Sequence, residues 1–314
     1  MHGNEGGDAV ENLRNHVREG RFQRTLAMLA AGAGALSGLE VAYEHYRGSY
    51  GQRIMYTPVA LSAALTGAGV WAFFSRSAAR SVLRGVSAVT LADSALGFYF
   101  HVRGIARKPG GWRLPVTNVV MGPPLFAPLL FGTAAYLGLI ASFLRREDAP
   151  DVPSTETRQS DASADCLPRA AERELRSIEQ DVREGRFQQH LLIATALSAT
   201  FSGVEALYSH YKGGFRYRSQ WLPVVLAPLL AVACAAGAGE RRLAVTAVPA
   251  LSVAALAVGG IGFFYHVRGV LRRPGGAKHI LYNTMYGPPV FAPLLFGAAG
   301  GLGLLASQLR RSGP

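Results

Sequence analysis

The sequence has few charged side chains for its length, because Asp, Glu, Lys and Arg make up 17% of its 314 residues. Soluble domains usually carry about 25%. Apolar residues make up 49% of the chain, and the mean hydropathy is +0.18. This balance is typical of chains whose apolar residues are gathered into runs that cross a bilayer. The composition therefore predicts the lipid bilayer as a partner.

Cysteine is also scarce, with two in the whole chain. Cys166 lies in a polar stretch and Cys234 in an apolar run, which excludes a disulfide framework and a cysteine-based metal site. The chain contains no phosphate-binding glycine loop ending in Lys-Ser/Thr, no His-Glu-x-x-His motif and no nucleophile elbow. Hydrolases and nucleotide-driven enzymes thus have little support, and the sequence names no reaction.

Acidic residues are outnumbered, 20 against 32 Lys and Arg, and the formal net charge is +12. An excess of this sign can indicate nucleic-acid binding. Here the arginines cluster at the edges of apolar runs, where membrane proteins carry them, so nucleic-acid binding is rejected. The polar residues 1–24 are not followed by a short apolar region with a small-residue cleavage site, so no cleaved signal peptide is expected.

Eight apolar runs have close to the ~20 residues that a membrane-spanning helix needs. We therefore expect an all-α polytopic membrane protein with eight transmembrane helices. Gly34 and Gly38 in the first run form a Gly-x-x-x-Gly step, which lets a neighbouring helix approach closely. The runs are residues 25–46, 58–74, 82–101, 125–144, 190–211, 221–239, 243–266 and 290–309.

The second half of the sequence repeats the first at a constant offset of 165 residues. The longest near-identity joins residues 122–132 to residues 287–297, with Leu125 replaced by Val290. Because each half has an even number of expected spans, both halves enter the membrane from the same side, as two tandem parallel four-helix repeats.

The predicted organisation has three parts. Residues 1–148 form the first membrane repeat, with an N-terminal amphipathic helix at the membrane surface; residues 149–170 form a disordered polar linker; residues 171–314 form the second repeat, with its own interfacial helix. Lys and Arg outside the spans are more numerous on the side that holds the termini and the linker. This bias predicts a multi-pass protein of the cell membrane with cytoplasmic termini.

A carboxylate, a tyrosine and a histidine recur near the end of the first run of each half. The first and third helices of one half run in the same direction, so their ends reach the same membrane face. A carboxylate inside a span costs ~2.5–3.5 kcal/mol unless it has a partner, which predicts a dedicated site in each half. The sets are Glu40, Tyr43, His45, His101 and Arg103, and Glu205, Tyr208, His210, His266 and Arg268.

One interpretation of these sets is a metal site. Two imidazoles and a carboxylate would suit non-haem iron, zinc or copper, with Glu40, His45 and His101 as ligands in one half and Glu205, His210 and His266 in the other. Alternatively, the two histidines of a half would ligate one b-type haem. The expected supporting residues around the ligands are Tyr43, Arg103, Asn118, Tyr208, Arg268 and Asn283.

The other interpretation is structural. Tyr and His collect at membrane interfaces, and Glu40 could pair with Arg103. Glu40 and His45 are five residues apart, which places them about 140° out of phase on a regular helix. On such a helix they do not share a face, so both interpretations stay open.

Asp93 lies midway along the third run, and its counterpart in the second half is Val258. An acid inside a span is a functional hypothesis by default, here an ion or proton path. A hydrogen bond to a nearby hydroxyl such as Ser87 or Thr90 would be the structural explanation. Glu44 is likewise unmatched, since Ser209 stands at its counterpart, so it is not expected in a site common to both halves.

Three functions therefore remain. The first is a membrane redox or electron-transfer component that holds iron, copper or b-type haem in each half, together with other membrane or redox subunits. The second is a transporter or channel with a path near Asp93. The third is a non-catalytic accessory subunit of a membrane complex. The high content of Ala, Gly and Arg hints at a bacterial source.

Overall fold

The computed structural model describes residues 21–148 and 187–309, and within these ranges the chain is helical, without a β-strand. The predicted N-terminal interfacial helix, the linker at residues 149–170, the start of the second repeat and Cys166 lie outside the described residues. In the first half the long helices are α2 (Gln23–Arg47), α3 (Thr57–Phe74), α5 (Arg84–Ala106) and α7 (Ala127–Phe143). In the second they are α9 (Phe187–Lys212), α10 (Trp221–Gly239), α12 (Ala247–Leu271) and α14 (Ala292–Leu309).

These helices coincide with the predicted apolar runs to within a few residues at each end, so the all-α fold class is confirmed. Five of them are long and apolar enough to cross a membrane: α2, α3 with its preceding turn, α9, α10 with its preceding turn, and α12. Helices α7 and α14 are shorter apolar helices. Helix α5 carries Arg84, Asp93 and several Ser and Thr residues, which lower its hydropathy.

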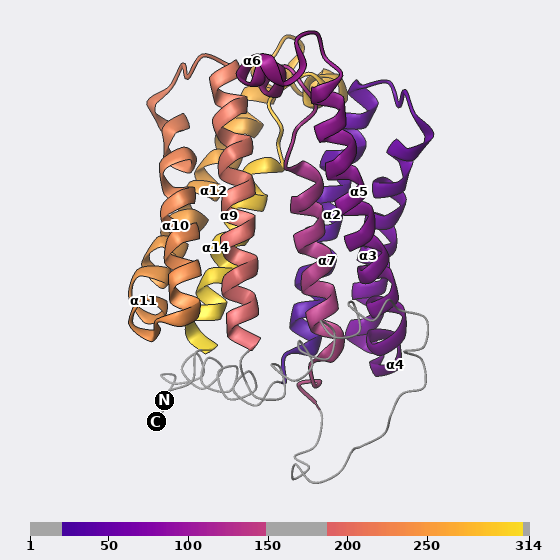
Figure 1. The fold of residues 1–314 in the computed structure, drawn as a ribbon, viewed down its shortest axis with the longest axis vertical. Helices are drawn as coiled ribbons and strands as arrows, with labels where there is room; N and C mark the ends of the chain where they lie inside the picture. Colours follow the sequence, from indigo (N-terminus) through magenta and orange to yellow (C-terminus); the bar gives the residue numbers. More distant parts are fainter. Residues whose placement is uncertain (1–20, 149–186, 310–314) are drawn as a thin grey trace.

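The long helices run side by side along the long axis of the molecule (Figure 1). In the first half α2 packs against α3 and α7, and α5 packs against the same two helices. In the second half α9 packs against α10 and α14, and α12 packs against the same two. The halves meet where α7 contacts α9 and where α2 contacts α14. The molecule is therefore built from two adjoining four-helix groups.

Glycines allow the closest helix contacts. A Cβ atom at Gly38 would overlap Ser62 of α3, and one at Gly203 of α9 would overlap Ala227 of α10. Gly259 of α12 lies against the backbone of Gly297 in α14. The predicted close approach at Gly38 is confirmed, and small residues bring these helices together where larger ones would not fit.

Short elements close the two ends of the bundle. At the end that carries the histidines lie η1 (Arg53–Tyr56), η3 (Gly111–Arg113) and α6 (Pro115–Val120) of the first half. Their second-half equivalents are η4 (Arg218–Gln220), η5 (Gly276–His279) and α13 (Ile280–Met285). At the opposite end lie α4 (Arg76–Ala78), the π-helical turn η2 (Ala79–Leu83) and α11 (Arg241–Val245) (Figure 1). We call these the histidine end and the arginine end.

Exposed aromatic side chains mark the histidine end. Tyr and Trp favour the membrane–water interface because one part of the ring system is apolar and another is polar. Side chains of this kind are typical of the level at which a membrane protein meets lipid headgroups. The Tyr and Trp side chains at this end that are about half exposed or more are Tyr46, Tyr56, Tyr99, Trp112, Tyr211, Tyr217, Trp221, Tyr265, Tyr282 and Tyr286.

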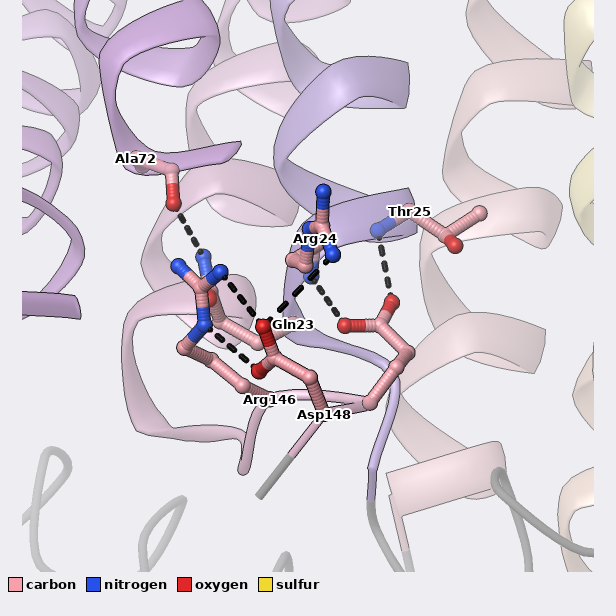
Figure 2. Close-up of polar contacts among 7 residues, drawn as sticks. Gln23, Arg24, Thr25, Ala72, Arg146 and Asp148 are labelled. Carbon is pink, nitrogen blue, oxygen red and sulfur yellow. Dashed lines mark hydrogen bonds and ion pairs between the residues drawn. The ribbon is translucent and has the colours of Figure 1, made fainter. Parts of the chain in front are cut away.

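At the arginine end, the segment that follows α7 returns to the start of α2. The backbone N–H of Gln23 donates to the carbonyl of Arg145 at 3.1 Å. The N–H groups of Arg24 and Thr25 donate to the two carboxylate oxygens of Glu147 at 2.9 and 2.8 Å. The first N–H groups of a helix have no partner within it, so this carboxylate satisfies two of them. Figure 2 shows the surrounding contacts.

Candidate histidine sites and the carboxylate cluster

Each repeated histidine binds a backbone carbonyl through Nδ1. In the first half, His45 Nδ1 lies 2.6 Å from the carbonyl oxygen of Met55, and His101 Nδ1 lies 2.5 Å from that of Pro124. A carbonyl oxygen only accepts hydrogen bonds, so Nδ1 of each ring carries the hydrogen. In the neutral ring Nε2 then keeps its lone pair, which is the form that ligates a metal.

The second half has the same arrangement. His210 Nδ1 lies 2.9 Å from the carbonyl oxygen of Gln220, and His266 Nδ1 lies 2.5 Å from that of Pro289. Gln220 and Pro289 follow Met55 and Pro124 after 165 residues. All four histidines thus present the same ring nitrogen to the same kind of partner.

A strained turn holds the first histidine of each half. Tyr50 has a φ of 43°, in the left-handed region, and its ring stacks on Tyr56 with centroids 4.2 Å apart. His45 meets the edge of Tyr50 at 6.0 Å. A non-glycine residue in this region is strained, and such strain collects at functional sites. The second-half equivalents are Phe215 with a φ of 45°, Trp221 stacked on it at 4.1 Å, and His210 at 6.1 Å.

The two histidines of one half are neighbours. His45 lies within electrostatic range of His101, and His210 lies within range of His266. Within residues 21–148 and 187–309, however, no three His, Cys, Asp or Glu side chains gather into a group that could hold one metal ion. The structure therefore brings the histidines together in pairs and places the predicted carboxylate ligands elsewhere.

Glu205 lies at the contact between the halves. Its Oε1 accepts a hydrogen bond of 2.8 Å from the backbone N–H of Phe126, and the N–H of Ala127 is a further donor. These residues open helix α7, so Glu205 of α9 caps a helix of the other half. Tyr208, one turn along α9, also hydrogen-bonds the Glu205 carboxyl group. The Phe126 ring stacks on Phe201 of α9 at 5.5 Å, which holds the two helices in register.

Glu40, the counterpart of Glu205, faces the same contact. The charged groups that act on it are Glu44, Arg47 and Glu205. Neither His45 nor His101 is among them. Among the ion pairs of the described residues none joins Glu40 to Arg103, so the predicted pairing with Arg103 is not formed. The two repeated carboxylates are thus near one another across the contact between the halves.

The tyrosine and arginine beside Glu40 extend this group. Arg47 Nη1 donates to the Tyr43 hydroxyl at 3.3 Å and lies 3.4 Å from Glu44 Oε1. The Tyr43 hydroxyl donates to the carbonyl oxygen of Gly287, ahead of α14, at 3.4 Å. We define the carboxylate cluster as Glu40, Tyr43, Glu44, Arg47, Glu205 and Tyr208. Sequence analysis assigned the two tyrosines to the histidines, and the signal against that was the 140° phase difference between Glu40 and His45.

The predicted supporting asparagines shape the loops. Asn118 Nδ2 donates to the carbonyl oxygens of Pro109 and Gly111 at 3.1 and 2.7 Å, which closes the turn where Gly110 has a φ of 80°. Asn283 makes the same bonds to Pro274 and Gly276, at 3.2 and 3.0 Å. These loops lead to the carbonyls that hold the second histidine of each half. Arg103 and Arg268 are exposed on the outer surface of the same end.

Asp93 of α5 has a hydroxyl partner on another helix. Thr57, at the start of α3, donates to Asp93 Oδ1 at 2.7 Å. The expected partner type is therefore present, although the hydroxyl is that of Thr57 and not of Ser87 or Thr90. The counterparts of Thr57 and Asp93 are Leu222 and Val258, so a polar pair in one half is replaced by an apolar pair in the other.

The chemistry available is that of paired imidazoles at one end of each half, and of a capped carboxylate between the halves. Comparison with protein-family models, curated proteins and solved structures finds no match to this chain.

Proposed function

We propose that the chain is a membrane redox or electron-transfer component in which each half holds one iron or copper ion, or one b-type haem, through its two histidines. The ligands are Nε2 of His45 and His101 in the first half and Nε2 of His210 and His266 in the second. The observation that carries this proposal is the Nδ1–carbonyl contact at all four rings. Metal-ligating histidines commonly donate their other ring N–H to such a carbonyl.

The membrane arrangement belongs to the same proposal. The chain crosses the bilayer eight times, as two tandem repeats within residues 1–148 and 171–314 joined by the linker at 149–170, with the arginine end in the cytoplasm of a bacterial cell. The packing of α2, α3, α5 and α7 corresponds helix by helix to that of α9, α10, α12 and α14, which supports two repeats. The exposed arginines Arg76, Arg80, Arg241 and Arg242 at one end support the orientation.

Two imidazoles suffice as the protein ligands of a haem, whose porphyrin supplies the other four donors, so the missing third side chain does not oppose this form of the site. The glutamates are then not ligands. Glu40 and Glu205 would join the halves and keep the two redox centres at a fixed separation. The aromatic side chains around the histidine end would lie between the centres and any partner subunit in the membrane.

The test is an absorption spectrum and a metal analysis of the detergent-purified chain. The wild type is expected to show a Soret band or one bound metal per half. The double variant His101→Ala/His266→Ala is expected to lose it, because each site keeps a single ligand. His279→Ala is the matched control, since His279 is exposed in η5 at the same end and belongs to neither pair.

A second variant separates ligation from folding. In His45→Ala/His210→Ala the other histidine remains, so a haem that stays bound should change its spin state and shift its bands. A folded, colourless and metal-free wild-type protein would contradict the proposal. Substrate flux that is lost in Asp93→Asn would then favour the transporter, and poor stability of the chain expressed alone would favour the accessory subunit.

A further inference from the structure

Two arginines of the first half, at the arginine end, lack partners among the described residues. Arg76 opens α4 and Arg80 lies one turn further on, in η2. Both are exposed, and neither makes a hydrogen bond or an ion pair with a residue that the structure describes. Residues four apart on a helix lie on the same side, so the two guanidinium groups form one surface.

The charges near this surface are mostly positive. The charged groups that act on Arg76 are Arg80, Arg145, Arg146 and one carboxylate, Asp148. Partial loss of solvent around its guanidinium group, followed by the charges of the three neighbouring guanidinium groups, holds the pKa of Arg76 below its usual value. A lowered pKa of an arginine means that its cation is disfavoured, and an anion beside it would remove that penalty.

Asp148 is already engaged. Its two oxygens lie 2.8 and 2.9 Å from Nε and Nη2 of Arg146, and one of them lies 3.6 Å from Nη1 of Arg24 (Figure 2). A carboxylate held by two guanidinium groups has little charge left for a third. Arg76 and Arg80 therefore have no acidic side chain among residues 21–148 and 187–309 that neutralises their charge.

The fold itself does not require Arg80, whereas Arg76 has a counterpart in Arg241. In the second half, Val245 and Pro249 stand at the positions of Arg80 and Arg84. Glu240 directly precedes the two arginines of that turn, Arg241 and Arg242. The equivalent turn there is thus less basic and carries its own acid. Ser75 stands in the first half where the second has Glu240, so Arg76 and Arg80 have no acid next to them in the chain.

Large apolar side chains lie next to the arginines in the chain. Trp71 and Phe74, in the last turn of α3, are 57% and 72% exposed. They end one of the candidate spans, so they lie where acyl chains meet headgroups. A small inorganic anion would use the arginines only, whereas a phospholipid would use the arginines and the aromatic rings together.

We propose that Arg76 and Arg80 bind the phosphate of an anionic phospholipid, whose acyl chains lie against Trp71 and Phe74. The guanidinium groups match the phosphate oxygens in geometry as well as in charge. This lipid would tie the first half to the leaflet at the arginine end. The site is independent of the histidine pairs, which lie at the other end of the bundle (Figure 1).

The test measures lipid binding to the full chain in detergent, by native mass spectrometry with phosphatidylglycerol, phosphatidylcholine or inorganic phosphate as the probe. Phosphatidylglycerol is expected to bind in preference to phosphatidylcholine. Each arginine contributes about 1 kcal/mol at an anionic surface, so Arg76→Gln/Arg80→Gln should weaken phosphatidylglycerol binding about 30-fold. Arg76→Lys/Arg80→Lys keeps the charge and should retain most of the affinity.

The matched control is Arg241→Gln/Arg242→Gln, which removes the same charge from the same end of the molecule. It should leave phosphatidylglycerol binding near the wild-type value. An equal loss in both double variants would mean a diffuse charge effect and would overturn the site. Inorganic phosphate that competes as well as the lipid, or a Trp71→Ala/Phe74→Ala variant that binds phosphatidylglycerol as wild type does, would overturn the assignment to a phospholipid.

Discussion

At the scale of single residues, Glu40 and Glu205 occupy equivalent positions and have different partners. Glu205 accepts hydrogen bonds from the first N–H groups of α7, whereas the groups acting on Glu40 are side chains, two of them acidic. A carboxylate at a helix N-terminus is stabilised by unpaired N–H groups and by the helix dipole. We therefore expect Glu205→Gln to lower the free energy of unfolding by about 1 kcal/mol, measured as thermal unfolding in detergent.

Glu40→Gln is the control for that substitution. It makes the same chemical change one repeat earlier, but it removes no hydrogen bond to the start of a helix and it removes a like charge from the neighbourhood of Glu205. Its unfolding temperature should equal that of the wild type or exceed it. If both substitutions destabilise the protein equally, the two carboxylates have equivalent roles and the cap on α7 is not the reason that Glu205 matters.

At the scale of elements, the contact of residues 145–148 with the start of α2 depends on two acidic side chains, Glu147 and Asp148, and we call this contact the acidic clamp. Glu147 and Asp148 correspond to Ser312 and Gly313, which have no carboxylate, so an equivalent acidic clamp on α9 has no side chains to form it. Arg146 holds the pKa of Asp148 at about 2, below its ordinary value, through two hydrogen bonds and its charge, with Arg24 adding to the effect.

This shift predicts a pH dependence for the clamp. Asp148 is charged in both the folded and the unfolded chain above its ordinary pKa, so its contribution to stability is complete there. As the pH falls towards about 2, the unfolded chain takes up the proton first and the contribution is lost. The difference in unfolding temperature between wild type and Asp148→Asn should therefore shrink between about pH 4 and pH 2.

Salt gives an independent check on the clamp. The Asp148 side chain is 53% exposed, so added salt should screen its charge and reduce the same difference at neutral pH. Glu147 is present in both proteins, so its contribution cancels from the comparison. A difference that is constant across the acidic range and in high salt would show that Asp148 acts through packing and not through charge.

The elements themselves were largely predictable from sequence, because apolar runs of bilayer length fold as helices whatever they pack against. The π-helical turn at residues 79–83 was not predictable, since it arises from how α3 turns into α5 at Ser75, which adopts an extended conformation. The cap on α7 by Glu205 was not predictable from sequence either. Its hydrogen-bond donor is a backbone N–H group 79 residues away, and because every residue except proline has such a group, no side-chain type in the sequence marks the partner.

For the histidine pairs, too, the sequence predicted the position of the residues along the helices but not all of their partners. Helix direction alone predicted that His45 and His101 would reach one end of the bundle, and they lie within electrostatic range there. The metal interpretation took Glu40 as a third ligand although the helical phase sets it about 140° from His45, and in the structure Glu40 faces the second half. The metal or haem itself stays a prediction, which the spectrum described above tests.

At the scale of the whole molecule, the two halves are proposed to cross the membrane in the same direction, and single-cysteine labelling tests this in cells. The starting protein would carry Cys166→Ser and Cys234→Ala, which removes both native thiols. Cysteines would then replace Ser49, Lys108, Gly213 and Lys278 at the histidine end, or Ser77 and Arg242 at the arginine end. All six positions lie outside the long helices, and all are exposed except Lys108, which is half-buried.

An impermeant maleimide added outside the cell should label the four cysteines of the histidine end, and the two of the arginine end should react only after the membrane is opened. This pattern follows because four spans in each half return the chain to its starting side, and because an arginine-rich end stays in the cytoplasm. Labelling of Ser49→Cys without Gly213→Cys would mean that the halves are inverted with respect to each other. In that case one of the helices between the two positions, such as α5 or α7, would not cross the bilayer. The two histidine pairs would then face opposite compartments and could not serve one electron-transfer partner.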